Sequence, residues 1–264
     1  MLRGMYTASG AMQALQRQQE MLSNNLANAR TPGFRADQAS LRTFPEMMIH
    51  QAATNERTGI RPAGNVGTLA TGVFMQAATP NFAPGSITET GNATDLQISS
   101  AEGVPMFTIL HGNGGGTAPE GEVLYTTNGQ FAVDRDGILR TTDGDQVLDE
   151  DGNIMNVGND DFKVSPEGVV TRGNGEQVGR LGLVTTNNTE QLERVENGLY
   201  RAPEALAQGN VKVDQGVLEL GNVAIEQTMA EMNAGLRQFE ANQKVIQAYD
   251  RTAEKAVSEI GRVR

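Results

Sequence analysis

Oxygen-bearing side chains are concentrated in one short stretch near the middle of the chain, where they could hold a hard cation. The stretch contains Asp143, Asp145, Asp149, Asp151 and Asn153. A calcium loop of the EF-hand type that starts at Asp149 would have Ile154 in place of its glycine and Asp160 in place of its glutamate. The Asp-Gly pairs in the stretch also suit tight turns. The sequence therefore favours hairpin turns with solvated carboxylates, and a cation site is the alternative.

A glycine-rich segment, HGNGGGTAPEGE at residues 111–122, is the second candidate for chemistry. A phosphate-binding loop needs a Gly-Lys-Ser/Thr sequence after its glycines, and acidic residues follow here instead. We interpret the segment as the tip of a hairpin. The pattern assigns no role to the glycines at 112–116.

Catalytic residues of the usual kinds are scarce. The only histidines are His50 and His111, and there is no cysteine. A pair of carboxylates for glycoside hydrolysis could come from the 20 acidic residues between 85 and 205. Such enzymes usually bind sugars on tryptophan or tyrosine, and the chain has no tryptophan, so a carboxylate hydrolase is the weaker interpretation. We predict no enzyme activity, no metal and no cofactor.

Negative charge is concentrated in the middle of the 264-residue chain. Residues 85–205 contain 7 basic and 20 acidic residues, a net charge of −13, whereas both ends are nearly neutral. An acidic surface repels nucleic acid and anionic lipid, so we predict neither as a partner. No apolar run is long enough to cross a bilayer, and residues 1–20 lack the apolar core of a secretory signal. We therefore expect no membrane insertion and no cleaved signal peptide.

The first helix is predicted from the spacing of apolar residues. They alternate at intervals of four and three, with polar Gln19 in one position: Met1, Met5, Ala8, Met12, Leu15, Leu22, Leu26 and Ala29. This heptad spacing is typical of a helix that packs along a seam. Because Asn25 and Asn28 weaken the last turn and Pro32 disfavours helical geometry at Thr31, we expect the helix to end by about Ala29.

A second heptad helix is predicted at the other end of the chain. One row contains Ile225, Met232, Phe239, Ile246, Ala253 and Ile260, and the other contains Asn222, Met229, Leu236, Gln243, Asp250 and Val257. Five consecutive heptads make this the strongest periodic signal in the sequence. Gly235 costs about 1 kcal/mol relative to alanine, so the helix is not optimised to stand alone.

The region between the helices changes character twice. Residues 31–84 are rich in Gly, Thr and Pro and predict an extended connector with one or two strands. Residues 85–205 contain short β-prone runs that precede turn dipeptides at Asn128-Gly129, Asp136-Gly137, Asp143-Gly144 and Asp151-Gly152. These dipeptides suit hairpin turns and predict an antiparallel β domain. The expected organisation is helix 1–30, connector 31–84, β domain 85–205, return connector 206–221 and helix 222–264.

The two terminal helices have two interpretations. They could cover the core of the β domain, or they could assemble with other helices. Their position at both ends, their strict spacing and their polar seam residues favour assembly, because polar seam positions can fix register and partner. We therefore predict an α+β, mainly β protein whose terminal helices pair as a coiled coil. The predicted assembly interface contains Met5, Met12, Leu15, Leu22, Asn25, Leu26, Asn28, Ile225, Met229, Met232, Leu236, Phe239, Ile246 and Val257.

A long motif after the first helix resembles a known family. The stretch LSNNLANARTPGFRA at 22–36 is similar to the N-terminal signature of the flagellar axial proteins, which form the rod and hook. The matching residues are Ser23, Asn25, Ala27, Asn28, Thr31, Gly33 and Phe34. Residues 125–148 and 179–202 resemble the β domain of basal-body rod proteins, and residues 216–250 resemble their C-terminal helix. The chain departs from the family after Asp95-Leu96-Gln97-Ile98, and the FPEMM stretch at 44–48 resembles rod-type paralogues of Gram-positive bacilli.

The resemblance implies a structural subunit of the flagellar basal-body rod that transmits torque for motility. Its implied partners are copies of itself, neighbouring axial proteins and the flagellar type III export apparatus, which exports such subunits without a cleaved peptide. Residues Thr31, Pro32, Gly33 and Phe34 would turn the chain from the assembly helix toward the β domain. A hook-type axial protein and a cell-surface adhesin or binding module are the alternatives. An adhesin would bind its ligand through residues 85–205 without its terminal helices.

Overall fold

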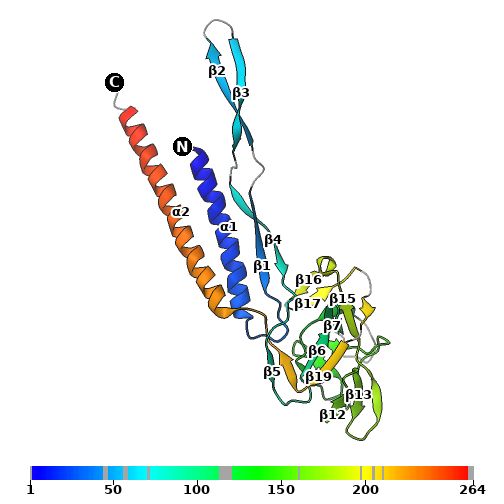
Figure 1. Cartoon of the computed structure of the whole chain (residues 1–264). Coiled ribbons are helices and arrows are strands. Elements are labelled where there is room, and N and C mark those ends of the chain that lie inside the picture. The colour runs from blue at the N-terminus through cyan, green and yellow to red at the C-terminus, as the bar shows by residue number, and fades with distance from the viewer. Residues whose placement is uncertain are drawn as a thin grey trace. The chain divides into compact units, whose positions relative to one another are not determined.

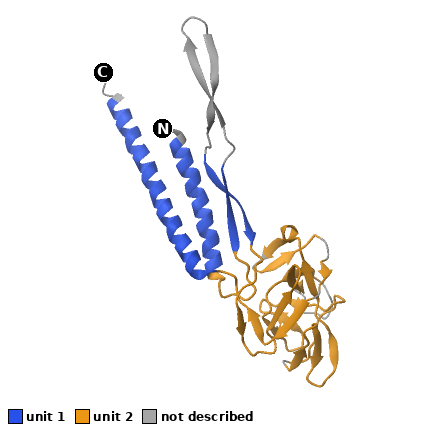
Figure 2. Cartoon of the chain, viewed as in Figure 1, with its two compact units in different colours: residues 1–26, 37–80, 224–264 blue, residues 27–36, 81–223 orange. Residues whose placement is uncertain are grey.

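The structure, a computed structural model, divides into two compact units (Figure 2). It describes residues 2–43, 47–55, 59–69, 72–112, 121–159, 161–196, 198–203, 206–209 and 211–260. Unit 1 consists of residues 1–26, 37–80 and 224–264, and unit 2 consists of residues 27–36 and 81–223. The chain therefore passes between the units four times.

Unit 1 contains the two long helices, α1 (Leu2–Ala27) and α2 (Ile225–Ile260) (Figure 1). The end of α1 at Ala27 lies two residues before the predicted end, where the asparagines and Pro32 interrupt helical geometry. No helix in the described part of the chain is long and apolar enough to span a bilayer.

The rest of unit 1 is a set of paired strands. The strand β1 (Asp37–Thr43) pairs antiparallel with β4 (Val73–Pro80), and β2 (Met47–Asn55) pairs antiparallel with β3 (Gly59–Leu69). The prediction of one or two strands in residues 31–84 is wrong, since four lie there. In β1, the first and third positions are half-buried, the second is exposed, and the last four are all exposed. Two-stranded ribbons leave both faces open, so they produce no alternating hydrophobic pattern to read.

Unit 2 is built from short antiparallel strands. Its elements are β5 Ile87–Glu89, β6 Leu96–Ser100, β7 Val104–His111, β8 Glu122–Thr126, β9 Phe131–Val133, β10 Leu139–Thr141, β11 Gln146–Val147, β12 Phe162–Val164, β13 Val169–Arg172, β14 Gln177–Arg180, β15 Leu183–Thr186, the 3-10 helix η1 Thr189–Gln191, β16 Glu193–Glu196, β17 Leu199–Arg201, β18 Ala207–Gln208, β19 Val211–Gln215 and β20 Val217–Glu219. The main sheet has the order β16-β17-β8-β7-β11-β10-β9, and β15 pairs with β7 and β18. Smaller sheets are β12-β13-β14, β19-β6 and β20-β5. The predicted α+β class with a mainly antiparallel β region is confirmed.

The predicted turn dipeptides have different outcomes. Strands β9 and β10 pair across Asp136-Gly137, and β10 pairs with β11 across Asp143-Gly144. The prediction of a hairpin at Asn128-Gly129 is wrong, because β8 pairs with β7 and β17 instead of β9. A Cβ at Gly129 would lie 1.7 Å from the backbone oxygen of Leu96. This glycine therefore permits a close approach of two backbones rather than a tight hairpin turn.

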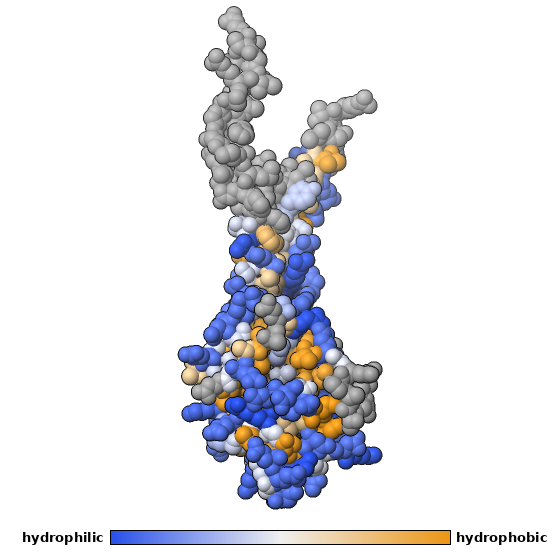
Figure 3. All heavy atoms as spheres, turned by 90° about the vertical axis from the view of Figure 1, so that its right-hand side faces the viewer, coloured by the Kyte–Doolittle hydropathy of each residue, from blue (hydrophilic) through white to orange (hydrophobic). Residues whose placement is uncertain are grey.

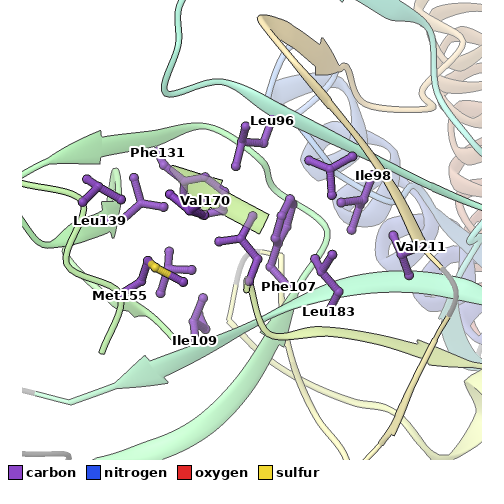
Figure 4. Close-up of a cluster of buried hydrophobic side chains, with 14 of the residues drawn as sticks. Leu96, Ile98, Phe107, Ile109, Phe131, Leu139, Met155, Val170, Leu183 and Val211 are labelled. Carbon is purple, nitrogen blue, oxygen red and sulfur yellow. The ribbon is translucent and has the colours of Figure 1, made fainter. Parts of the chain in front are cut away.

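One large hydrophobic cluster forms the centre of unit 2. Figure 4 shows side chains from several strands pointing toward one another, among them Phe107, Phe131, Leu139 and Val170, all at most 3% exposed. The rings of Phe107 and Phe131 meet edge to face with centroids 5.0 Å apart. A second cluster contains Met106, Tyr125, Val184 and Tyr200. Unit 2 therefore has its own core.

Candidate assembly interface

One face of α1 is covered within unit 1. Leu22 is 4% exposed, and Ala8 and Ala14 are also buried on the helix. The predicted seam residues Met5, Met12, Leu15 and Leu26 are half-buried. All described α1 residues of the predicted heptad row are therefore buried or half-buried.

The two helices of unit 1 approach each other closely in antiparallel order. A Cβ at Gly4, near the start of α1, would lie 2.3 Å from the hydroxyl of Tyr249, near the end of α2. Further along the pair, a Cβ at Gly235 of α2 would lie 3.5 Å from the side-chain Oε1 of Gln19 in α1. Figure 1 shows α1 and α2 running alongside each other. Because Gly4 has no side chain, the ring of Tyr249 can occupy the space beside α1.

The covered positions of α2 also follow a heptad pattern. Buried or half-buried residues alternate at intervals of four and three: Thr228, Met232, Gly235, Phe239, Asn242, Ile246 and Tyr249. Of the predicted interface, Met232, Phe239 and Ile246 belong to this set. The small and polar row beside them was missed, because a search for apolar seams passes over threonine, glycine and asparagine.

Four large apolar residues of α2 are open to solvent in the single chain, and we call them the open row. Met229, Leu236 and Val257 come from the second predicted row, and Ile225 comes from the first. Ile225 is 38% exposed, Met229 47%, Leu236 48% and Val257 74%. These large apolar side chains lie on a helix whose other side is covered, so they remain available for contact with another chain.

Asparagine 25 is engaged inside the chain. It is 4% exposed, its Nδ2 donates to the backbone oxygen of Asp37 at 2.8 Å, and its Oδ1 accepts from the backbone N–H of Asp37 at 2.9 Å. The side chain thus binds both backbone groups of the first residue of β1. Asn28 is half-buried, and its Oδ1 accepts from the hydroxyl of Thr31 at 3.3 Å.

The predicted exit turn is folded as part of unit 2. Gly33 has a φ of +68°, and its backbone oxygen accepts a hydrogen bond from the hydroxyl of Thr127 at 2.5 Å. Phe34 is 2% exposed and has the guanidinium of Arg194 5.6 Å from its ring centroid. Thr31 bonds back to the carbonyl of Asn28, as a closed turn requires. Pro32 is half-buried.

Beside this turn, two residues were not found from the sequence, and a third, Asn222, was wrongly assigned to the helix. Arg35 and Glu219 form a buried ion pair, with 2.6 Å between Nη1 and Oε1. Asn222, predicted to lie in a helical row, precedes α2 and belongs to unit 2, where its side chain accepts from Ala36 N–H at 2.7 Å. Arg35 and Glu219 are far apart in sequence, and no local pattern links them.

The candidate chemical residues serve as turn caps and local pairs. Asp149 Oδ1 accepts from the backbone N–H groups of Asp151 and Asn153 at 3.0 and 2.7 Å, as in an Asx turn. His111 Nδ1 lies 2.8 Å from Asp145 Oδ1, a partly exposed pair at the end of β7. No group of three or more metal-ligating side chains occurs among the described residues. Residues 113–120 of the glycine-rich segment and the side chain of His50 lie outside the described part.

On the face drawn in Figure 3, hydrophilic side chains cover most of unit 2, with separate hydrophobic patches between them. Exposed apolar residues of this unit include Ile87 at 61% and Val123 at 46%. The surface of unit 2 is thus mixed, with apolar patches separated by hydrophilic side chains. On α2, in contrast, Ile225, Met229, Leu236 and Val257 follow one another along a single helix.

Family models match three parts of the chain. The model for the flagella basal body rod protein matches residues 5–35, which contain most of α1 and the exit turn. The model for the flagellar hook protein FlgE/F/G D1 domain matches residues 115–172, and that for the flagellar basal body rod FlgEFG protein C-terminal region matches residues 214–259. The two terminal matches therefore cover the candidate interface.

Full-length relatives agree with these matches. The chain is 38% identical to the flagellar hook-basal body complex protein FlhO of Bacillus subtilis, over the whole of both chains. It is 30% identical to the flagellar basal-body rod protein FlgF of Escherichia coli, over 95% of each chain. It is also 28% identical to the rod protein FlgG of Bacillus subtilis, over 98% of this chain and 99% of the relative. The chain belongs to the flagellar basal-body rod and hook protein family.

Proposed function

We propose that the chain is a structural, non-enzymatic subunit of the bacterial flagellar basal-body rod, where it transmits torque for motility. In this proposal it assembles through its terminal helices with copies of itself and with neighbouring axial proteins. The observation that carries the proposal is the open apolar row Ile225, Met229, Leu236 and Val257 on α2. This row lies on a helix whose sequence matches the C-terminal region of rod proteins through residue 259.

Burial of that row supplies a driving force for assembly. Covering the exposed half of Met229 or Leu236 would contribute roughly 1 kcal/mol each, at about 25 cal/mol per Å² of apolar surface. Within the chain, α1 and α2 approach each other at Gly4 and Tyr249 and at Gln19 and Gly235. In the proposed assembled state, the helices pair as a coiled coil with each other and with neighbouring subunits. The organisation into helices 1–30 and 222–264, connectors 31–84 and 206–221 and β domain 85–205 is part of the same proposal.

The proposed location is the flagellar basal body, reached through the flagellar type III export apparatus. Helix pairing that is completed only on assembly suits this route, because a marginal helix stays easy to unfold until it finds partners. Gly235 and the polar residues in the covered row of α2 keep the helix marginal in this sense.

Complementation of a strain that lacks the chain tests the proposal. We expect the full-length chain to restore swimming and to copurify with basal bodies, and a chain without residues 225–264 to do neither. A chain in which Asp149 of unit 2 is replaced by Asn is the matched control and should restore both. Normal flagella with the truncated chain would overturn the proposal.

Hydrogen exchange separates this proposal from the simpler view that the helices only complete the fold of one chain. In the dilute chain, we expect amides of α2 to exchange much faster than amides of the unit 2 core, and to become protected in the assembled form. Full protection of α2 in the dilute chain would favour the simpler view.

A further inference from the structure

All four passages of the chain between the units run through one hydrogen-bonded region of unit 2. The segments 27–36, 81–86 and 219–223 contain the residues of unit 2 that adjoin these passages. We call residues 33–36, 81–86 and 219–222 the junction. Its backbone hydrogen bonds are Gly33 N to Glu219 O at 2.8 Å, Asn222 N to Phe34 O at 3.3 Å, Leu220 N to Ser86 O at 2.8 Å and Asn81 N to Ala36 O at 2.8 Å. The three segments are thus paired with one another.

A buried ion pair connects the three segments through side chains. Arg35 and Glu219 are 3% and 9% exposed at their side chains, and Arg35 Nη1 also donates to the backbone oxygen of Ala83 at 2.8 Å. Glu219 Oε1 accepts a further hydrogen bond from the backbone N–H of Gly85 at 2.7 Å. Removal of one partner would leave the other charge buried without compensation, so the pair opposes any separation of the segments.

Asn222 and Arg194 add further cross-connections. Asn222 accepts from Ala36 N–H at 2.7 Å, and its Nδ2 donates to the backbone oxygens of Asn81 and Ala83 at 2.8 and 2.9 Å. Arg194 of β16 donates from Nη2 to the backbone oxygen of Arg35 at 2.9 Å. The junction is therefore bonded to the main sheet of unit 2 as well as within itself.

We propose that Arg35, Glu219 and Asn222 are positioning residues that hold the junction closed under torsional load. Every covalent path between the helices and the core of unit 2 passes through these three segments. With the cross-connections intact, torque is shared by all of them, and without them it acts on separate extended strands. This inference rests on the proposed function, since it concerns how a rod subunit carries torque.

Hydrogen exchange on the purified full-length chain tests the closed junction without reference to flagella. Glu219→Gln keeps the size and an oxygen acceptor but removes the charge. We expect the amides of Gly33 and Gly85 to exchange about a hundredfold faster, as loss of a buried ion pair predicts. The amide of Leu139, which donates to Met155 O at 3.0 Å in the core, should not change. Equal protection of the junction in variant and wild type would overturn the inference.

A second variant covers the case in which Glu219→Gln destabilises the whole unit. Asn222→Ala removes three hydrogen bonds at a half-buried position without leaving a buried charge. It should speed exchange at Ala36 while the core amides keep their protection. Arg201→Ala removes the exposed ion pairs of Arg201 with Glu122 and Glu193, elsewhere in unit 2, and is the control for both variants. A core that loses protection together with the junction in Asn222→Ala would also overturn the inference.

Swimming at several medium viscosities tests the role under load. We expect Asn222→Ala to enter basal bodies in wild-type amounts, to swim normally at low viscosity and to slow more than wild type as viscosity rises. A variant that swims like wild type at every viscosity, or that folds but does not enter basal bodies, overturns the load-sharing role. If the wild-type chain itself is not found in basal bodies, the proposed function fails instead, and the exchange experiment still decides whether the junction is closed.

Discussion

The two units of the chain differ in how much of their apolar surface they bury by themselves. Unit 2 contains a cluster of fully buried side chains that includes Phe107, Leu139 and Val170. In unit 1, the buried apolar residues among those described are Ala8, Ala14 and Leu22, and two of these are alanines. Unit 2 can therefore fold from its own contacts, whereas unit 1 gains much less from its own packing.

The difference indicates that unit 1 is the part of the chain that needs partners. Burial of a large apolar side chain stabilises a fold by about 1.5 to 3 kcal/mol, so a unit with a few small buried side chains is marginal. The exposed apolar residues of α2 are the remaining surface from which stability can come.

Truncation of a core residue of unit 2 should have the largest effect. Phe107 is 0% exposed and packs edge to face on Phe131. We expect Phe107→Ala to lower the free energy of unfolding of unit 2 by about 3–5 kcal/mol, through lost burial and the cavity that remains. Urea denaturation followed by near-ultraviolet circular dichroism measures it. Tyr6→Ala, at a position 74% exposed on α1, is the control, and an equal loss in both variants would contradict the contrast between the units.

An alanine at the exit turn should have the next largest effect. Gly33 has a φ of +68°, and a Cβ there would lie 2.4 Å from the backbone oxygen of Thr127. We expect Gly33→Ala to cost about 2 kcal/mol or more, since a left-handed conformation and a backbone clash act together. Gly144, with a φ of +98° and no atoms within 4 Å of its Cβ position, is the matched site for the conformational cost alone. If the thermal midpoints of the two variants fall equally, the close contact between Gly33 and Thr127 does not hold the exit turn in place.

Truncation on the open row of α2 should barely change the isolated chain. Leu236 is 48% exposed, so we expect Leu236→Ala to change the free energy of unfolding by less than about 0.5 kcal/mol. Incorporation into basal bodies should nevertheless fall sharply. Lys255→Ala, at an exposed position of α2 outside both predicted rows, is the control and should leave incorporation unchanged. Normal incorporation of Leu236→Ala would show that this row does not contact a neighbour.

The sequence was sufficient to predict the elements whose signals are local. Heptad spacing identified both terminal helices, and the row Met232, Phe239 and Ile246 is covered in the structure. The residues that accompany this row in the structure include Gly235 and Tyr249, which lie toward α1. A rule that selects the most apolar residues passes over such positions. Apolarity indicates that a residue will be buried, but it does not say by which chain.

The connections that hold the exit turn could not be predicted, for a different reason. Arg35 and Glu219 are separated by 184 residues, and Asn222 binds backbone groups 141 and 186 residues away. The acceptors at Asn81 and Ala83 are backbone oxygens, which every residue type has, so the sequence does not identify them. The motif at residues 22–36 therefore marked the place of the turn, and the structure was needed to show what it binds.

The smallest effect is expected at the exposed ion pair between Arg201 and Glu122. Hydrogen bonds from Arg201 lower the pKa of Glu122 below its ordinary value. The stability from this pair is present above the ordinary carboxyl pKa and is lost as pH falls through the lowered value. Arg201→Ala should therefore slightly lower the thermal midpoint at neutral pH and match wild type in acid, with the pKa of Glu122 rising toward its ordinary value by NMR titration. Because exposed pairs contribute little, a large loss at neutral pH would mean that charge rather than the apolar core distinguishes unit 2 from unit 1.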